Sequence, residues 1–128
     1  MDQQLNYQEW FFQSDYDLET AEHMLKSGRN VYCIFMCHLC LEKALKGLYI
    51  KRLNQFAPKI HNLMYFVDAL ALEPEDEHGA FLLDLNEMSM TTRYPEDLRK
   101  MIKDYSRSQT DNIFQQTKTV QQWIKSLL

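Results

Sequence analysis

The chain has 128 residues, of which 45% are hydrophobic, and its 14 basic and 18 acidic residues give a formal net charge of −4. A single domain of this length can bury a hydrophobic core. Only 3 glycines and 3 prolines interrupt the sequence, so long helices are expected rather than many strands joined by tight turns. The mildly acidic balance argues against broad electrostatic binding to duplex DNA.

The sequence predicts neither membrane insertion nor export. No apolar run approaches the roughly 20 residues that a helix needs to span a bilayer. The first residues, MDQQLNYQEW, lack the basic and then apolar pattern of a signal peptide. The cysteine count is odd, at 3, which is typical of a reducing compartment. We therefore expect a cytoplasmic protein.

Two long helices are predicted in the first half of the chain. Apolar residues recur at helical spacing over residues 7–27, and Gly28 follows as a C-terminal signal. Asn30 is expected to cap a second helix that extends to about residue 53. This second helix is apolar around nearly its whole circumference, which is typical of the central helix of a bundle or of a helix that contacts a second subunit.

The second half of the chain predicts three further helices and one ambiguous segment. The helices cover about 61–72, about 75–90, and about Thr110 to the C-terminus. The segment 95–105 fits one or two amphipathic turns, with Pro95 at the first helical position. Short connections between long helices favour antiparallel neighbours. The predicted fold is therefore all-α, an up-and-down four-helix bundle with an additional short or terminal helix, in one domain comprising all 128 residues.

Three cysteines in the stretch CIFMCHLC have the C-x3-C-x2-C spacing of enzymes that hold an iron–sulfur cluster. In those enzymes the cysteines lie on a loop that precedes a large barrel, whereas here they lie within an apolar helical segment. Free cysteine behaves as a small buried hydrophobe. We therefore interpret Cys33, Cys37 and Cys40 as core residues, and we predict neither a metal site nor a cofactor.

His38, Glu42 and Lys46 are spaced by four residues, so they share one face of the second predicted helix. Buried polar groups need partners. Two interpretations are open: an ion-paired seam within the bundle or at a dimer interface, or the polar floor of a ligand site. His61, at the predicted start of the third helix, is either a first-turn hydrogen bonder or a functional residue.

Three segments, in this order and spacing, carry a resemblance to a known family. They are residues 17–50, which contain the element EKALK, residues 60–63, IHNL, and residues 92–97, TRYPED. Together they resemble the HEPN family, named for nucleotide-binding domains of higher eukaryotes and prokaryotes. The resemblance implies a helical bundle, frequently a homodimer, that binds nucleotides or accompanies a small nucleotidyltransferase encoded as a separate chain. Other members of the family are toxin ribonucleases that use an arginine, four to six residues and then a histidine.

The stretch TRYPED also suggests a ligand contact by its own chemistry. Pro95 disfavours a helical conformation at Tyr94, so the backbone should turn there and present Arg93 and Tyr94 at one end of the bundle. Arginine suits phosphate, and tyrosine offers a face on which a base can stack. In the alternative interpretation, Tyr94 closes the end of the core while Arg93 forms an ion pair with Glu42 or Asp97.

The leading hypothesis is a nucleotide-binding HEPN-like domain, or the partner of a minimal nucleotidyltransferase. Its expected ligand-binding residues are Arg93, Tyr94, Lys46, His38, Glu42 and His61. One alternative is a ribonuclease toxin of a toxin–antitoxin pair, although no histidine of this chain follows an arginine at the family's spacing. Another is a non-catalytic, dimerising interaction module. We expect binding rather than catalysis, a homodimer, and a nucleotide or RNA ligand.

Overall fold

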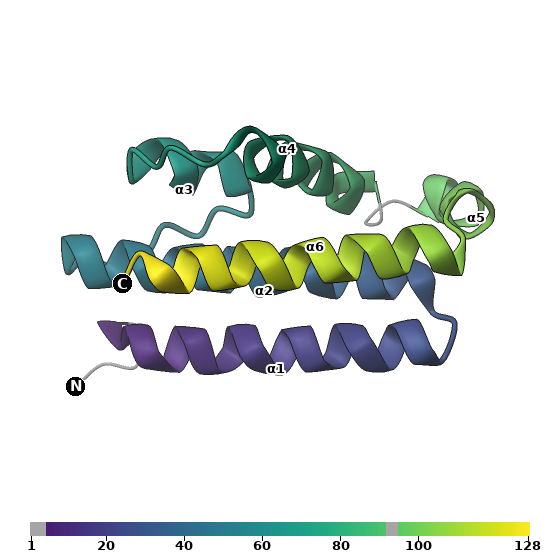
Figure 1. The fold of residues 1–128 in the computed structure, drawn as a ribbon, viewed down its shortest axis with the longest axis horizontal. Coiled ribbons are helices and arrows are strands. Elements are labelled where there is room, and N and C mark those ends of the chain that lie inside the picture. The colour runs from purple at the N-terminus through teal and green to yellow at the C-terminus, as the bar shows by residue number, and fades with distance from the viewer. Residues whose placement is uncertain (1–4, 92–94) are drawn as a thin grey trace.

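The computed structural model describes residues 5–91 and 95–128, and no β strand occurs among them. The helices are α1 (Tyr7–Lys26), α2 (Asn30–Leu53), α3 (Leu63–Ala69), α4 (Asp76–Thr91), α5 (Pro95–Asp104) and α6 (Arg107–Ser126). The four longer helices, α1, α2, α4 and α6, alternate in direction, while α3 and α5 are short (Figure 1). The predicted all-α bundle is confirmed. None of the described helices is long and apolar enough to cross a membrane.

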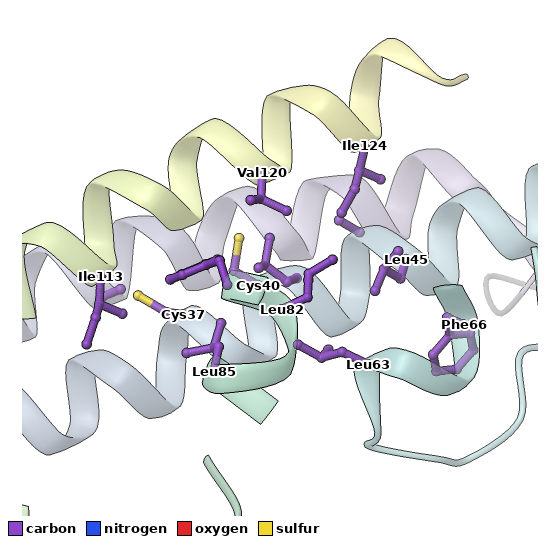
Figure 2. Packing of buried hydrophobic residues seen from close by; sticks show 14 of the residues in the cluster. Cys37, Cys40, Leu45, Leu63, Phe66, Leu82, Leu85, Ile113, Val120 and Ile124 are labelled. Carbon is purple, nitrogen blue, oxygen red and sulfur yellow. The ribbon is translucent and has the colours of Figure 1, made fainter. Parts of the chain in front are cut away.

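Helix α2 lies at the centre of the bundle, where it packs against α1, α3, α4 and α6. Most of its 24 residues are buried, so its apolar circumference is covered by the chain's own helices. Figure 2 shows side chains from α4 and α6 pointing toward the cysteine-bearing face of α2, among them Leu82, Leu85, Ile113 and Val120. Each fully buried leucine or isoleucine contributes roughly 1.5–3 kcal/mol to folding.

The close approach of α1 to α2 depends on Gly47. A Cβ atom at this position would lie 2.7 Å from Cε2 of Phe11 and 3.3 Å from Cβ of Trp10. Real Cβ atoms do not make contacts as short as the first of these, so a larger residue would require the Phe11 ring, or α1 with it, to shift. The glycine therefore brings Trp10 close to the polar face of α2 on which Lys46 lies.

The predicted cap of the second helix is wrong. Arg29 is the N-cap residue of α2 and its side chain makes no capping hydrogen bond. Asn30 is instead the first helical residue, and its Nδ2 atom donates to the carbonyl oxygen of Tyr105 at 3.1 Å. The asparagine amide thus ties α2 to the segment between α5 and α6, a tertiary contact that local sequence does not reveal.

The third helix begins later than predicted. His61 precedes it, and Asn62 is its N-cap, with the Asn62 side chain accepting a hydrogen bond from the backbone N–H of Met64 at 2.9 Å. Asparagine satisfies an otherwise unpaired N–H group of the first turn, which fixes the helix start at Leu63. The prediction of a helix over 61–72 is therefore corrected to a shorter element, with His61 in the connection that precedes it.

The ambiguous segment 95–105 forms the short helix α5, which begins at Pro95 as predicted. The last helix begins at Arg107, earlier than expected, because Ser106 and Gln109 form a reciprocal cap. The backbone N–H of Gln109 donates to Oγ of Ser106 at 3.1 Å, and the N–H of Ser106 donates to Oε1 of Gln109 at 3.0 Å. This arrangement is a capping box.

Candidate functional site

Three polar side chains of α2 are buried on one face of the helix. His38, Glu42 and Lys46 are only 2%, 4% and 6% exposed, respectively. Their spacing of four residues places them one above another along the helix, as the sequence predicts. Removing charged groups from water costs several kcal/mol for each ion unless other groups compensate, so the partners of these residues define the site.

The carboxylate of Glu42 is paired with the ammonium of Lys46. The Nζ atom of Lys46 lies 3.1 Å from Oε2 of Glu42. The same atom lies 5.8 Å from the ring centroids of Trp10 and Phe66, contributed by α1 and α3. An ammonium ion is attracted to the face of an aromatic ring at such distances. The buried lysine is therefore stabilised by one carboxylate and two aromatic rings.

His61 completes this polar cluster from outside the bundle core. Its Nδ1 atom lies 3.0 Å from Oε1 and 3.2 Å from Oε2 of Glu42. A carboxylate only accepts hydrogen bonds, so Nδ1 carries the proton and donates it. The side chain of His61 is 57% exposed, against 6% for that of Glu42. The histidine is thus the solvent-accessible member of an otherwise buried polar cluster.

Asn86 of α4 positions both histidines, and sequence reasoning missed it. Its Oδ1 atom accepts a hydrogen bond from the backbone N–H of Leu63 at 3.0 Å, which anchors the chain just after His61. The same oxygen lies 3.4 Å from Nε2 of His38. Asparagine is a poor helix former. An asparagine next to the buried Leu85, within a predicted amphipathic helix, was the signal in the sequence that could have indicated a structural role for Asn86.

The contacts on the polar face of α2 agree in part with each of the two interpretations, the ion-paired seam and the ligand site. The pairing of Glu42 with Lys46 is the ion pair expected of a seam within the bundle. The exposed imidazole of His61 is the accessible polar group expected of a ligand site. His38 lies deeper, with Nδ1 3.8 Å from Oε1 of Glu42, beyond hydrogen-bonding distance.

The structure brings together four of the predicted site residues: His38, Glu42, Lys46 and His61. The other two, Arg93 and Tyr94, lie outside the described residues, and so does the turn predicted around them. The same holds for the alternative in which Tyr94 closes the core and Arg93 pairs with an acidic residue.

The three cysteines are core residues, as predicted. Cys33, Cys37 and Cys40 are fully buried and belong to the main hydrophobic cluster. Burial raises the pKa of the Cys40 thiol from 9.0 to about 12, and a thiol in that state is a poor nucleophile and a poor metal ligand. The backbone carbonyl of Cys40 accepts a hydrogen bond from Oγ of Ser14 at 2.7 Å, which ties α2 to α1.

Comparison with known proteins places this helical arrangement in a family. The family model for the HEPN domain matches residues 7–127 of the sequence. The structure is similar to the crystal structure of TT1696 from Thermus thermophilus, with a TM-score of 0.77 and 24% sequence identity. That similarity covers 96% of this chain and 98% of the other, and at this identity it shows a shared fold. None of the curated proteins matches the sequence. The chain belongs to the HEPN domain family.

Proposed function

We propose that this HEPN domain binds a nucleotide, with His61 and Arg93 contacting phosphate and Tyr94 stacking on the base. One observation carries the proposal: the exposed imidazole of His61 is held by a hydrogen bond to the buried carboxylate of Glu42. With Nδ1 engaged in that bond, Nε2 is the ring nitrogen that can meet a ligand. A protonated imidazole donates from Nε2 to a phosphate oxygen in a charge-assisted hydrogen bond.

The charges behind His61 suit an anionic ligand. Glu42 alone would repel a phosphate, but the ammonium of Lys46 lies 3.1 Å from its carboxylate and balances that charge. His38 and Lys46 are buried, so in this proposal neither contacts the ligand directly: Lys46 holds Glu42 through their ion pair, and His38 lies beside that pair. In this proposal Arg93 supplies a planar donor for phosphate, and Tyr94 supplies an aromatic face for the base.

The same site could receive a nucleotide that a second protein presents. The HEPN resemblance implies a small nucleotidyltransferase as a partner chain, and the proposal includes a nucleotide held at such a partner's active site. An accessible histidine beside a balanced carboxylate serves either source, because both offer the same phosphate chemistry. Free nucleotide is the simpler ligand to test.

The experiment is thermal melting of the purified chain across titrations of ATP, GTP and short RNA. A ligand that binds only the folded state adds about 2.7 kcal/mol of stability at 100 times its dissociation constant. His61→Ala and Arg93→Ala test the two proposed phosphate contacts. His23→Ala is the matched control, because His23 is an exposed α1 histidine whose Nε2 atom lies 3.9 Å from Oε1 of Glu19, within the same helix.

A saturating rise in melting temperature that disappears in His61→Ala and Arg93→Ala, and persists in His23→Ala, supports the proposal. A rise that survives in both site variants places the ligand elsewhere and refutes the assignment of these residues. If no ligand raises the melting temperature, nucleotide binding by the isolated chain is rejected. The nucleotidyltransferase complex then becomes the form to test.

A second candidate function is RNA cleavage, which the resemblance implies for other HEPN proteins. The pairing of His61 with Glu42 favours it, because a carboxylate that orients an imidazole is a common general-base arrangement. In this function the His61–Glu42 pair would take the place of the arginine and histidine that the resemblance implies for ribonucleases of the family. The test is incubation of RNA with the protein in the presence of a metal chelator, beside His61→Ala and His23→Ala. Intact RNA with the unaltered protein, or cleavage that survives His61→Ala, rejects this function.

A further inference from the structure

A groove of about 570 Å³ lies between α4 and α6, and no residue of the Glu42 cluster is among those that line it. Its floor is apolar and includes Phe81, Ile113 and Val120, which are 6%, 9% and 1% exposed. The carboxylates of Glu77 and Asp84 line the same groove and are exposed at its rim. Among the described residues that line it there is no lysine or arginine. The groove therefore combines an apolar floor with negative charge.

Helix α5 has the complementary character. Its side chains Arg99, Lys100 and Lys103 are exposed, and Ile102 beside them is 59% exposed. In the described part of α5, Met101 alone is buried. Figure 1 shows α5 at one end of the bundle, beyond the end of α4. This short helix thus presents basic side chains and one large apolar side chain to solvent.

We propose that α5 of a second copy of this chain occupies the groove between α4 and α6. Lys100 and Lys103 would lie against the acidic rim, and Ile102 would cover part of the apolar floor. The length of α5 matches the length of the groove. The 10 residues of α5 span about 15 Å, and the part of α4 that lines the groove, from Glu77 to Met88, spans roughly 16 Å at 1.5 Å per residue.

In the proposed dimer the insertion is reciprocal: each copy places its α5 in the groove of the other, which gives a closed two-fold assembly rather than an open chain. Opposite charges across the contact offset the repulsion between two copies that each carry a net charge of −4. The contact uses none of the residues assigned to the nucleotide site, so it stands or falls independently of the proposed function. Salt screens exposed charges, and the dimer is therefore expected to weaken as ionic strength rises.

Charge reversal tests the contact from both sides, using substitutions at exposed positions. One variant reverses the groove, Glu77→Lys with Asp84→Lys, and the other reverses the helix, Lys100→Glu with Lys103→Glu. Sedimentation equilibrium at about 1 to 100 µM measures the dimer dissociation constant, and circular dichroism checks folding. The control, Glu19→Lys with Asp68→Lys, changes the net charge as the groove variant does, but on α1 and α3.

The unaltered chain and the control variant are expected to dimerise with similar dissociation constants. Each charge-reversed variant alone should dimerise at least tenfold more weakly. An equimolar mixture of the two reversed variants should recover the dimer, since every groove then meets an α5 of opposite charge. A chain that stays monomeric at low salt overturns the proposal. So does a dimer that both reversals leave unchanged, because it must use another surface, such as the exposed Phe12 and Tyr16 of α1.

Discussion

The Nδ1 atom of His61 lies 3.0 Å from Oε1 of Glu42, so an exposed imidazole is bonded to a carboxylate inside the bundle. The two residues are 19 positions apart, and the bond joins the segment before α3 to the middle of α2. Glu42 is bonded at the same time to the buried Lys46. The two partners of this carboxylate therefore contribute unequally to stability, because one is solvated and the other is not.

Replacing Glu42 by alanine should destabilise the fold strongly. The change leaves the ammonium of Lys46 buried without its carboxylate, and removing one partner of a buried ion pair costs about 3–5 kcal/mol. His61→Ala should cost no more than about 1 kcal/mol, because an exposed partner gains little from pairing. The free energy of unfolding from urea denaturation at neutral pH measures both effects.

The double variant Glu42→Ala with Lys46→Met separates lost charge from lost packing. It removes both ions, so most of the stability lost in Glu42→Ala should return. Equal losses for Glu42→Ala and His61→Ala would show that the buried lysine finds another partner, contrary to the geometry of the cluster.

The buried thiol of Cys40 predicts a loss of stability at alkaline pH. Burial raises the pKa of this thiol from 9.0 to about 12 in the folded chain. Because the folded pKa is the higher one, the folded state retains the proton more tightly, and this contribution is complete below pH 9.0. It is lost progressively as the pH rises from there toward about 12.

The measurement is the free energy of unfolding as a function of pH for the unaltered chain and for Cys40→Ala. Other groups titrate in the same range, so the difference between the two slopes isolates the thiol. The variant should lose less stability per pH unit above pH 9.0. Parallel curves for the two proteins would contradict the raised pKa.

Sequence predicts what is local and periodic in this molecule. The bounds of α1, α2 and α4 follow from apolar spacing and from Gly28, whose φ of 80° suits a residue without a side chain. The sharing of one helix face by His38, Glu42 and Lys46 also follows from spacing alone. The burial of the three cysteines follows from their place in an apolar helix.

Contacts between distant segments could not be predicted in the same way. No local pattern shows that Asn30 bonds to Tyr105, or that Asn86 meets both His38 and the backbone of Leu63. The first contact ties α2 to the segment between α5 and α6, and Asn86 anchors the connection that carries His61. The cap of α6 is different, since Ser106 and Gln109 have the spacing of a capping box in the sequence itself.

Ser106→Ala should destabilise the protein by about 1 kcal/mol, the usual cost of losing a capping hydroxyl. Its Oγ atom accepts a hydrogen bond from the backbone N–H of Gln109, which would otherwise lack a partner within the helix. Ser108→Ala is the control, because this exposed residue in the first turn of α6 has no part in the cap. Thermal melting compares the two. A loss in Ser108→Ala as large as that in Ser106→Ala would contradict the assigned cap.

Gly47→Ala should destabilise the bundle by about 1–3 kcal/mol, although alanine is the better helix former. The new Cβ would lie 2.7 Å from the ring of Phe11, so that ring, or α1 with it, would have to shift. Gly79→Ala, in α4, is the matched control, since its Cβ would lie 3.5 Å from Cγ of Pro74, an ordinary contact. That change should stabilise the protein by about 0.5–1 kcal/mol.

Urea denaturation of both glycine variants, and of Gly47→Ala combined with Phe11→Leu, tests whether the clash lies at this contact. The smaller leucine vacates the space that the new methyl group needs. The loss in the double variant should therefore be less than the sum of the two single losses, by at least about 0.5 kcal/mol. If Gly47→Ala proved as stable as the unaltered protein, or if the two losses simply added, then the glycine does not set the distance between α1 and α2. In that case Trp10 would owe its place beside Lys46 to other contacts of α1 with α2, such as the hydrogen bond from Ser14 to the carbonyl of Cys40.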